Sequence, residues 1–472
     1  MSDHHKPAPT PTPSRDKLDE SGFLDGMGRL LRSSGAMGGV VARLAGQRLG
    51  FETGGAAHAE ALKNALGGLK GPLMKGAQLL AAVPGLLPEE YADTLAGLQS
   101  NAPPMGWGFV ARRMKAELGP EWGRHFSAFG RTAVAAASLG QVHKARLPDG
   151  RLVACKLQYP GMDSAVETDL GQLRALLGVY RSFSTTIRQD EVYAELAERM
   201  REELDYQREA ANLRLYQHML GTSAQVRVPN PVDDLTTKRL LVMEWVEGSP
   251  VGAAFTPDMA QEGRNQVASA LFKAWYKPFY HYGVIHGDPH PGNFTLRAGE
   301  GGEGPGINLL DLGAIRVFRP RFVHGVVELY RALQEQDGER AYHAYELWGF
   351  KGLSRETAAI LGEWARFFFK PLLTDRAVTM RESNNPEAAR AMLEQVFEGL
   401  KRTGGVTLPR EFVMLDRSAI GLGSAFLRLD AKLNWHRMFE GLLEGYSLAA
   451  LERQQAAALQ QAGVPGPDAP TA

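Results

Sequence analysis

The spacing of apolar and polar residues divides the chain into a helical first part, a strand-rich middle and a helical last part. Residues 1–20 are polar, with Pro at every second position from 7 to 13, which is typical of a disordered tail. Apolar residues at helical spacing, interrupted by Gly and Pro, predict a helical extension at 21–125. Alternating runs in 126–248 predict strands. The pattern from 249 to 452 is again mostly helical, and we expect 453–472 to be a frayed tail.

The helical pattern at residues 23–51 carries basic side chains beside its apolar ones. Arg29, Arg32, Arg43 and Arg48 alternate with leucines and valines. This pattern fits a basic amphipathic helix on a membrane surface, and it equally fits a helix that packs on the main domain. Both interpretations stay open here.

Composition is that of a globular protein and argues against some partners. The 472 residues are enough for two or three domains. Lys and Arg total 53, as do Asp and Glu, so no basic excess points to nucleic acid. Cys155 is the single cysteine, so no internal disulfide can form and a reducing compartment is favoured. With no apolar run of the ~18–20 residues that span a bilayer and no signal-peptide pattern, we expect a cytoplasmic protein, at most peripheral at an inner membrane face.

A loop of small residues leads into two strands joined by a tight turn. The loop and the start of the first strand, residues 135–143, read AAASLGQVH, and PDG at 148–150 forms the turn. Alternation in the second strand places Ala154 and Lys156 on one face. The opposite face carries Val153, Cys155 and Leu157.

This hairpin has the layout of a nucleotide-phosphate loop followed by the lysine-bearing strand of kinases. The loop residues expected at the phosphates are Ala135, Ala136, Ala137 and Ser138. Ala154 would line an adenine pocket, and Lys156 would reach the phosphates. Alanine resists the positive φ that glycine loops use, so the loop must differ in shape from theirs.

Residues 190–220 show the spacing of one long helix with an acidic face. Asp205, Glu209 and Asn212 fall at i, i+4 and i+7. A charged helix face is usually only solvated. Here a carboxylate must neutralise Lys156 if that lysine is to be held in place, and Glu209 is the candidate.

An apolar strand at residues 239–248 ends in a Gly turn, which is the form of the hinge between the lobes of a kinase. Backbone groups near Glu244 to Val246 would then hydrogen-bond adenine. Among the N-terminal helices, Lys75 and Gln78 share one face of an apolar stretch. A lysine buried there needs a carboxylate partner, whereas a surface lysine could simply cover its apolar neighbours with its stem.

Several candidate functional residues lie close together in residues 286–293, which read HGDPHPGN. Two prolines and two glycines predict a fixed loop rather than a helix or a central strand. Asp288 is placed to accept the proton of an attacking hydroxyl, and Asn293 to ligate Mg²⁺. A second candidate metal ligand, Asp311, follows an apolar strand and precedes a Gly turn. The alternative is a surface turn whose two histidines form a metal site.

Together these motifs resemble the UbiB family of atypical, protein-kinase-like proteins, the AarF/ADCK group linked to ubiquinone biosynthesis. The resemblance spans roughly residues 66–446. It rests on AAASLGQVH, on KLQYPG at 156–161, on ELDY and EAAN within 203–212, and on the Asp288 loop. The family's Lys-x-Gly-Gln signature reads KGAQ at 75–78, with Ala77 in place of the signature glycine.

The resemblance implies an α+β, two-lobed protein-kinase-like fold with a helical N-terminal extension and a mostly helical C-lobe. It implies ATP and Mg²⁺ as cofactors, and ATPase or unusual phosphotransfer chemistry, because the extension would block a peptide site. Lys75 and Gln78 would face Glu203 and Asp205 in a regulatory contact. The implied partners are an isoprenoid or quinone lipid, or the proteins that make it.

Two other functions compete with this one. A small-molecule kinase of the aminoglycoside or choline kinase type shares the loop around Asp288, but it needs no cap over its site, and the Ala-rich loop and the Lys75 helix argue against it. A nucleotide-binding scaffold for a lipid-biosynthesis complex stays open, although all the polar catalytic residues are present.

Overall fold

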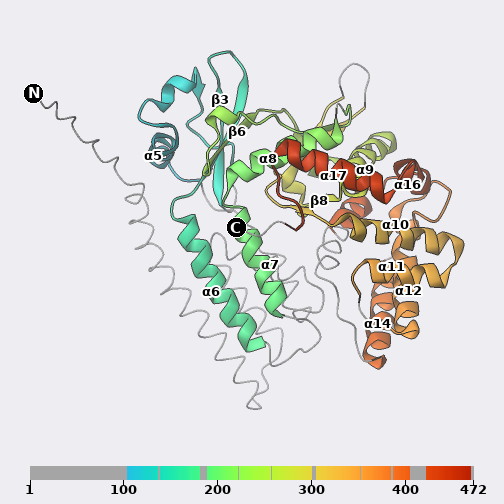
Figure 1. Ribbon diagram of the computed structural model, residues 1–472. Coiled ribbons are helices and arrows are strands. Elements are labelled where there is room, and N and C mark those ends of the chain that lie inside the picture. Colours follow the sequence, from blue (N-terminus) through green and yellow to red (C-terminus); the bar gives the residue numbers. More distant parts are fainter. Residues whose placement is uncertain are drawn as a thin grey trace, which may run out of the picture.

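The protein is described from a computed structural model, which combines a sheet-containing N-lobe with a mostly helical C-lobe (Figure 1). The described residues are 104–136, 139–180, 189–221, 223–256, 258–299, 304–350, 352–383, 386–403 and 421–468. The basic segment 23–51, for which a helix was predicted, and the residues Lys75, Gln78, Ala137 and Ser138 therefore lie outside the described residues.

An antiparallel five-stranded sheet forms the N-lobe. Its path runs β1-β3-β4-β6, and β2 pairs with β3. The strands are β1 Ala128–Phe129, β2 Ala135–Ala136, β3 Gly140–Arg146, β4 Leu152–Gln158 and β6 Leu240–Glu244. Lys156 lies in the central strand β4, where it pairs with Val142 on one side and Leu241 on the other.

The two faces of β4 belong to two different cores, as the alternation predicted. Val153, Cys155 and Leu157 are almost fully buried in the core of the N-lobe. Ala154 points the other way, into the core that fills the C-lobe. A register shift by one residue would exchange these faces, so the burial of the first three side chains directs Lys156 toward the space between the lobes.

Three helices complete the N-lobe: α5 Trp107–Leu118, α6 Met162–Tyr180 and α7 Gln189–Glu202. Helix α5 lies within residues 21–125, for which the sequence predicted helices. Its Val110 and Met114 are fully buried in the same core as Cys155. Helices α6 and α7 lie side by side and project away from the sheet (Figure 1).

The single long helix expected at residues 190–220 is wrong, because the chain forms two helices there. Between α7 and α8 (Tyr206–Leu220), Asp205 adopts an extended backbone, with φ −109° and ψ 96°. Its carboxylate accepts hydrogen bonds from the N–H groups of Gln207 at 3.0 Å and Arg208 at 3.2 Å. Asp competes poorly in a helix interior but caps an N-terminus well, so a new helix begins after Asp205.

The C-lobe is built around α9 Gln261–Tyr282, which packs against α8. Its strands form a four-stranded sheet in the order β5-β10-β9-β7 and a β8–β11 pair. They are β5 Val226–Arg227, β7 Ser249–Pro250, β8 Val284–His286, β9 Phe294–Arg297, β10 Gly306–Leu309 and β11 Ile315–Val317. The later helices are α10 Pro320–Glu335, α11 Gly338–Leu347, α12 Arg355–Phe369, α13 Met380–Ser383, α14 Pro386–Arg402 and α16 Trp435–Leu443.

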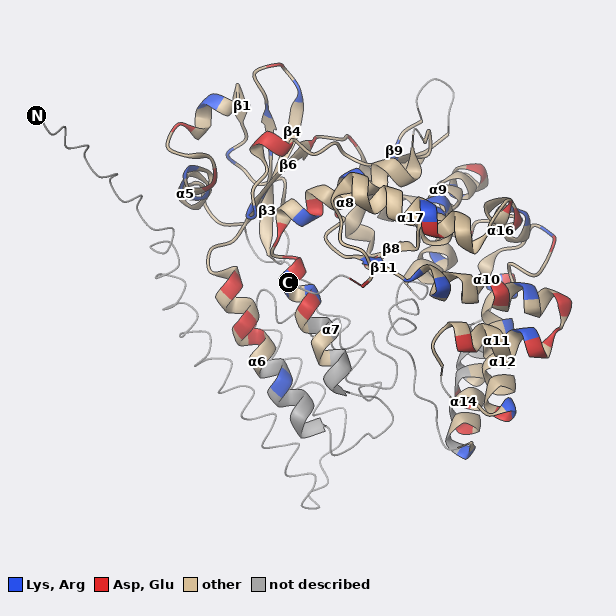
Figure 2. Ribbon diagram, viewed as in Figure 1, with Lys and Arg blue, Asp and Glu red and all other residues tan. Residues whose placement is uncertain are grey.

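Charged side chains of both signs are interspersed over the C-lobe helices α10 to α12, whereas acidic residues dominate the first turns of α6 (Figure 2). In the part of the chain that the structure describes, no helix combines the length and the apolar character needed to cross a membrane.

The frayed tail expected from residue 453 is wrong, because helix α17 spans Leu448–Ala462. Leu451, Ala458 and Leu459 are buried, and the helix packs on α8 and α9. The buried Gln455 donates through Nε2 to the carbonyl oxygens of Tyr282 and Phe318, both at 2.8 Å. The buried positions do recur at helical spacing, but the Gln- and Ala-rich composition hid this pattern.

We predict that Gln455→Ala lowers the free energy of unfolding by ~1–3 kcal/mol, because two carbonyl acceptors lose a buried donor. The matched control is Gln454→Ala, an exposed neighbour on the same helix, which should change stability by no more than ~0.5 kcal/mol. Urea unfolding of both variants makes the comparison. Equal effects would show that α17 is not held through Gln455.

Candidate active site

A three-way ion pair lies where β4, α8 and the end of β10 meet. The Nζ of Lys156 lies 2.8 Å and 2.9 Å from the two carboxylate oxygens of Glu209. It also lies 2.9 Å from Oδ2 of Asp311. The ion pair expected between Lys156 and Glu209 is therefore present, and Asp311 joins it from the C-lobe.

Two of the three side chains in this ion pair are largely buried. The side chains of Lys156 and Glu209 are 12% and 3% exposed, whereas that of Asp311 is 37% exposed and faces solvent in part. Burial acts to lower the pKa of Lys156, but Asp311 and Glu209 outweigh it and hold that pKa well above the ordinary value. Burial raises the pKa of Glu209 to about 7, with Lys156 opposing the rise. The lysine is therefore a permanent cation held against the face of β4.

Tyr206 lies next to Lys156 and next to Gly140, the residue at which the Ala-rich loop enters β3. Lys156 Nζ lies 5.1 Å from the centre of the Tyr206 ring. A Cβ on Gly140 would lie 2.3 Å from the carbonyl oxygen of Leu157 and 2.8 Å from the Tyr206 hydroxyl. This crowding requires glycine at the start of β3.

The described part of the Ala-rich loop is strand β2. Ala135 and Ala136 are exposed and pair with Val142 and Gln141 of β3. Gln141 is fully buried and holds the chain that enters α5: its Oε1 accepts from the N–H of Met105 at 2.7 Å, and its Nε2 donates to the carbonyl of Met105 at 3.1 Å. The loop is thus tied to the segment that leads into α5.

The loop after β8 is shaped by its two histidines. His286 stacks on Trp275, with ring centres 5.2 Å apart, and its Nδ1 accepts from the N–H of Asp288 at 3.2 Å. The Nδ1 of His290 accepts from the N–H of Gly292 at 3.0 Å. Within the described ranges, no three His, Cys, Asp or Glu side chains come together as metal ligands. Both histidines instead fix the backbone around Asp288.

Asn293 and Asp311 are brought together by the antiparallel β9–β10 hairpin, in which Phe294 pairs with Leu309. The Asn293 amide donates through Nδ2 to the carbonyl of Asp288 at 2.9 Å, and its own backbone carbonyl accepts from Leu310 N at 2.9 Å. A carboxylate and an amide oxygen are ligands that Mg²⁺ prefers. The pair therefore fits a Mg²⁺ site, with Asp288 on the same loop.

Asn212 and Asn308 support the site and were not among the predicted site residues. Asn212 of α8 is fully buried and donates through Nδ2 to the carbonyl of Leu312 at 2.8 Å. It thereby ties the helix of Glu209 to the segment after Asp311. The spacing of three residues between Glu209 and Asn212 on one helix could have indicated this role from the sequence.

Asn308, also fully buried, links the hinge to the β9–β10 hairpin. It donates through Nδ2 to the carbonyl of Glu247 and to the Thr295 hydroxyl, both at 3.0 Å. The sequence could have indicated this role, because Asn308 is a polar residue inside the apolar run before Asp311.

The expected hinge follows β6. Strand β6 ends at Glu244, and the N–H of the next residue, Trp245, donates to the carbonyl of Leu152 at 2.9 Å. The Glu244 carboxylate contacts Arg227 at 2.5 Å, so this side chain is engaged with the C-lobe. Ala154 pairs with Met243 beside it and is 5% exposed. Ala154 thus lies beside the last residues of β6, next to the residues expected to form the hinge.

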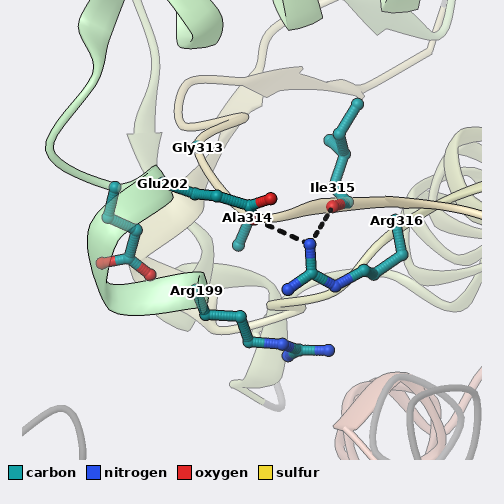
Figure 3. A pocket seen from close by; sticks show the side chains of 7 residues that line it. Arg199, Glu202, Gly313, Ala314, Ile315 and Arg316 are labelled. Atoms are coloured by element: carbon teal, nitrogen blue, oxygen red, sulfur yellow. Dashed lines mark hydrogen bonds and ion pairs between the residues drawn. The ribbon is translucent and has the colours of Figure 1, made fainter. Parts of the chain in front are cut away.

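The expected regulatory residues follow α7. Asp205 is the cap of α8, as described above, and Glu203 lines a small pocket with residues from α7 and from the segment after Asp311 (Figure 3). The other lining residues are Arg199, Glu202, Gly313, Ala314, Ile315 and Arg316. The expected partners Lys75 and Gln78 lie outside the described residues, so their contact stays a prediction.

Comparison with known proteins gives the family. Residues 97–345, more than half of the chain, match the ABC1 atypical kinase-like domain. The chain belongs to this family. AarF domain-containing protein kinase 1 of Xenopus laevis is 34% identical over 271 residues, which are 57% of this chain and 52% of that protein. Atypical kinase coq-8 of Caenorhabditis elegans is 27% identical over 71% of this chain and 44% of that protein.

A solved structure agrees with the fold of this ABC1-family chain. The complex of Rv3197 with erythromycin, from Mycobacterium tuberculosis, is 28% identical and covers 82% of this chain and 95% of that one, with a TM-score of 0.56. The predicted α+β, kinase-like fold is thereby confirmed, as is the resemblance to the AarF group. The chain spans about half the length of most of the curated relatives it matches.

We predict that Lys156→Met destabilises the protein more at high pH than at low pH. Without the cation, the pKa of the buried Glu209 rises further above its unfolded value. A carboxyl with a raised folded pKa contributes favourably only below its unfolded pKa, and this contribution is lost as the pH rises through the folded pKa. At ~1.4 kcal/mol per pKa unit, the variant should lose ~1–2 kcal/mol more at pH 8 than at pH 5.

Urea unfolding at the two pH values measures this difference. Lys144→Met on the neighbouring strand is the control, because it breaks a solvent-exposed pair with Glu247, and its effect should be nearly the same at both pH values. A pH-independent loss for Lys156→Met would mean that Glu209 does not depend on this lysine.

Proposed function

We propose that this chain is an atypical kinase-like ATPase or phosphotransferase that uses Mg-ATP. The observation that carries the proposal is the buried Lys156–Glu209 pair, with Asp311 beside it and with Asp288 and Asn293 on the adjoining loop. A lysine held by a helix glutamate and two oxygen ligands presented by one hairpin are what phosphoryl transfer needs for positioning and charge stabilisation.

Each side chain has a distinct role in this proposal. Lys156 would exchange its contact with Asp311 for the phosphates, while Glu209 keeps it in place. Asp311 and Asn293 would hold Mg²⁺, which when bound supplies neutralisation of phosphate charge. Asp288 would accept the proton of the attacking hydroxyl or water.

The nucleotide would lie along the edge of the N-lobe sheet. Ala154 would contact adenine, and backbone groups from Glu244 to Val246 would hydrogen-bond it. The backbone of the loop Ala135 to Ser138 would cover the phosphates from above. Exposure of Ala135 and Ala136 leaves their strand accessible to a ligand.

The biological role proposed here is support of ubiquinone or related isoprenoid-lipid biosynthesis. It is supported by membership of the ABC1 family and by the coq-8 and AarF-named relatives. Contact of Lys75 and Gln78 with Glu203 and Asp205 remains part of this proposal as a regulatory contact. Any membrane contact would be peripheral, and nucleic acid is not proposed as a partner.

We predict that Asp288→Asn keeps Mg-ATP affinity within a few fold but lowers ATP hydrolysis by ~10²-fold or more. A proton acceptor acts in the chemical step and contributes little to ground-state binding. Titration calorimetry and a phosphate-release assay on the same variant separate the two effects. Asp258→Asn, an exposed aspartate of the C-lobe, is the control. Unchanged hydrolysis in Asp288→Asn would show that Asp288 is not the proton acceptor.

We also predict that Mg-ADP raises the melting temperature of the wild type by mass action. Asp311→Asn should lose the Mg²⁺-dependent part of this rise, because the amide is a weaker ligand than the carboxylate. Thermal denaturation with ADP alone and with Mg-ADP tests this. The same Mg²⁺-dependent rise in both proteins would exclude Asp311 as the metal ligand.

A further inference from the structure

The last residue of α7 joins the two segments that hold Lys156. Glu202 accepts through Oε2 from Nη1 of Arg316 at 2.7 Å, and its Oε1 lies 2.5 Å from Nη2 of Arg208. The Glu202 side chain is 10% exposed and that of Arg316 is 16% exposed. The contact between Glu202 and Arg316 is therefore largely removed from solvent, where ion pairs are least screened, whereas the Arg208 side chain is 34% exposed.

The two arginines belong to the elements that carry the carboxylates of the site. Arg208 immediately precedes Glu209 in the first turn of α8. Arg316 lies in β11, and the short segment from Asp311 to Arg316 contains the turn at Gly313. In Figure 3, the side chains of Glu202 and Arg316 point toward one another at the pocket that Gly313 and Ala314 also line.

The carboxylate of Glu202 therefore lies between two elements, α8, which carries Glu209, and the segment that joins Asp311 to β11. Glu209 and Asp311 are on separate elements, and both must reach Lys156 Nζ within 2.9 Å. Removing a buried carboxylate that lies between two cations leaves those cations uncompensated. Arg208 and Arg316 would then separate, and their elements would carry Glu209 and Asp311 apart.

We propose that Glu202 is a positioning residue that sets the separation of Glu209 and Asp311, and through it the affinity of the site for its divalent cation. This inference rests on the proposed Mg-nucleotide function. Glu202 does not touch the nucleotide site itself. It acts through Arg316 on the segment that presents Asp311, and through Arg208 on the helix that presents Glu209.

The test measures Mn²⁺ affinity by electron paramagnetic resonance in protein saturated with ADP. Loss of a residue that orients a metal ligand typically costs 10–100-fold in metal affinity. Glu202→Gln and Arg316→Gln should each weaken Mn²⁺ binding by about 10-fold or more. The double variant should be no weaker than Glu202→Gln alone, because Glu202→Gln already removes the contact with Arg316.

Two measurements separate positioning from general damage. Metal-free ADP affinity should stay within about twofold in both single variants, because Lys156, the proposed phosphate ligand, lies on β4 and on neither element that Glu202 contacts. Arg201→Gln is the matched control: it breaks an α7 ion pair with Glu167 whose side chains are 52% and 56% exposed, and Mn²⁺ affinity should not change. If Glu202→Gln does not fold, Arg316→Gln makes the same test.

Unchanged Mn²⁺ affinity in the bridge variants would overturn the inference while leaving the proposed function intact. So would additive losses in the double variant, or an equal loss of metal-free ADP affinity. A wild-type protein that binds neither ADP nor Mn²⁺ would instead overturn the proposed function, and this inference with it.

Discussion

One ammonium group shared between two carboxylates is the constraint on which the rest of the structure depends. Lys156 can satisfy Glu209 and Asp311 only if β4, α8 and the end of β10 meet within hydrogen-bond distance of a single atom. A buried charge is costly unless it is paired and hydrogen-bonded. The three elements are therefore held in one arrangement, in which Asp311 is the member most exposed to solvent.

Around Lys156, polar side chains connect neighbouring elements by donating hydrogen bonds to backbone carbonyls. Gln158, at the end of β4, donates to the carbonyl of Leu204 at 3.0 Å. Asn212 donates in the same way to the carbonyl of Leu312, and Asn308 donates to that of Glu247. Each bond fills a backbone acceptor that neither helix nor sheet can satisfy. The segment after β6, the helix of Glu209 and the β9–β10 hairpin are thereby positioned relative to one another.

Much of this arrangement could be predicted, because local rules determine it. Period-two burial in β4 directed Lys156 to the correct face, and the Gly- and Pro-rich loop placed Asp288 and Asn293 near one another. The break before α8 was missed because Asp205 fits a helical face as well as a cap. Helix α17 and the role of Asn308 were missed because their partners are distant in sequence, and a local pattern does not report what a side chain meets after folding.

Hydrogen–deuterium exchange with and without Mg-ADP tests the central claim most directly. If the Lys156 ion pair is the nucleotide cradle, exchange should slow together in β4, in the first turn of α8 and at residues 310–313. Lys156→Met should lose this protection in all three segments. Protection that appears elsewhere while these three segments stay unchanged would contradict the account.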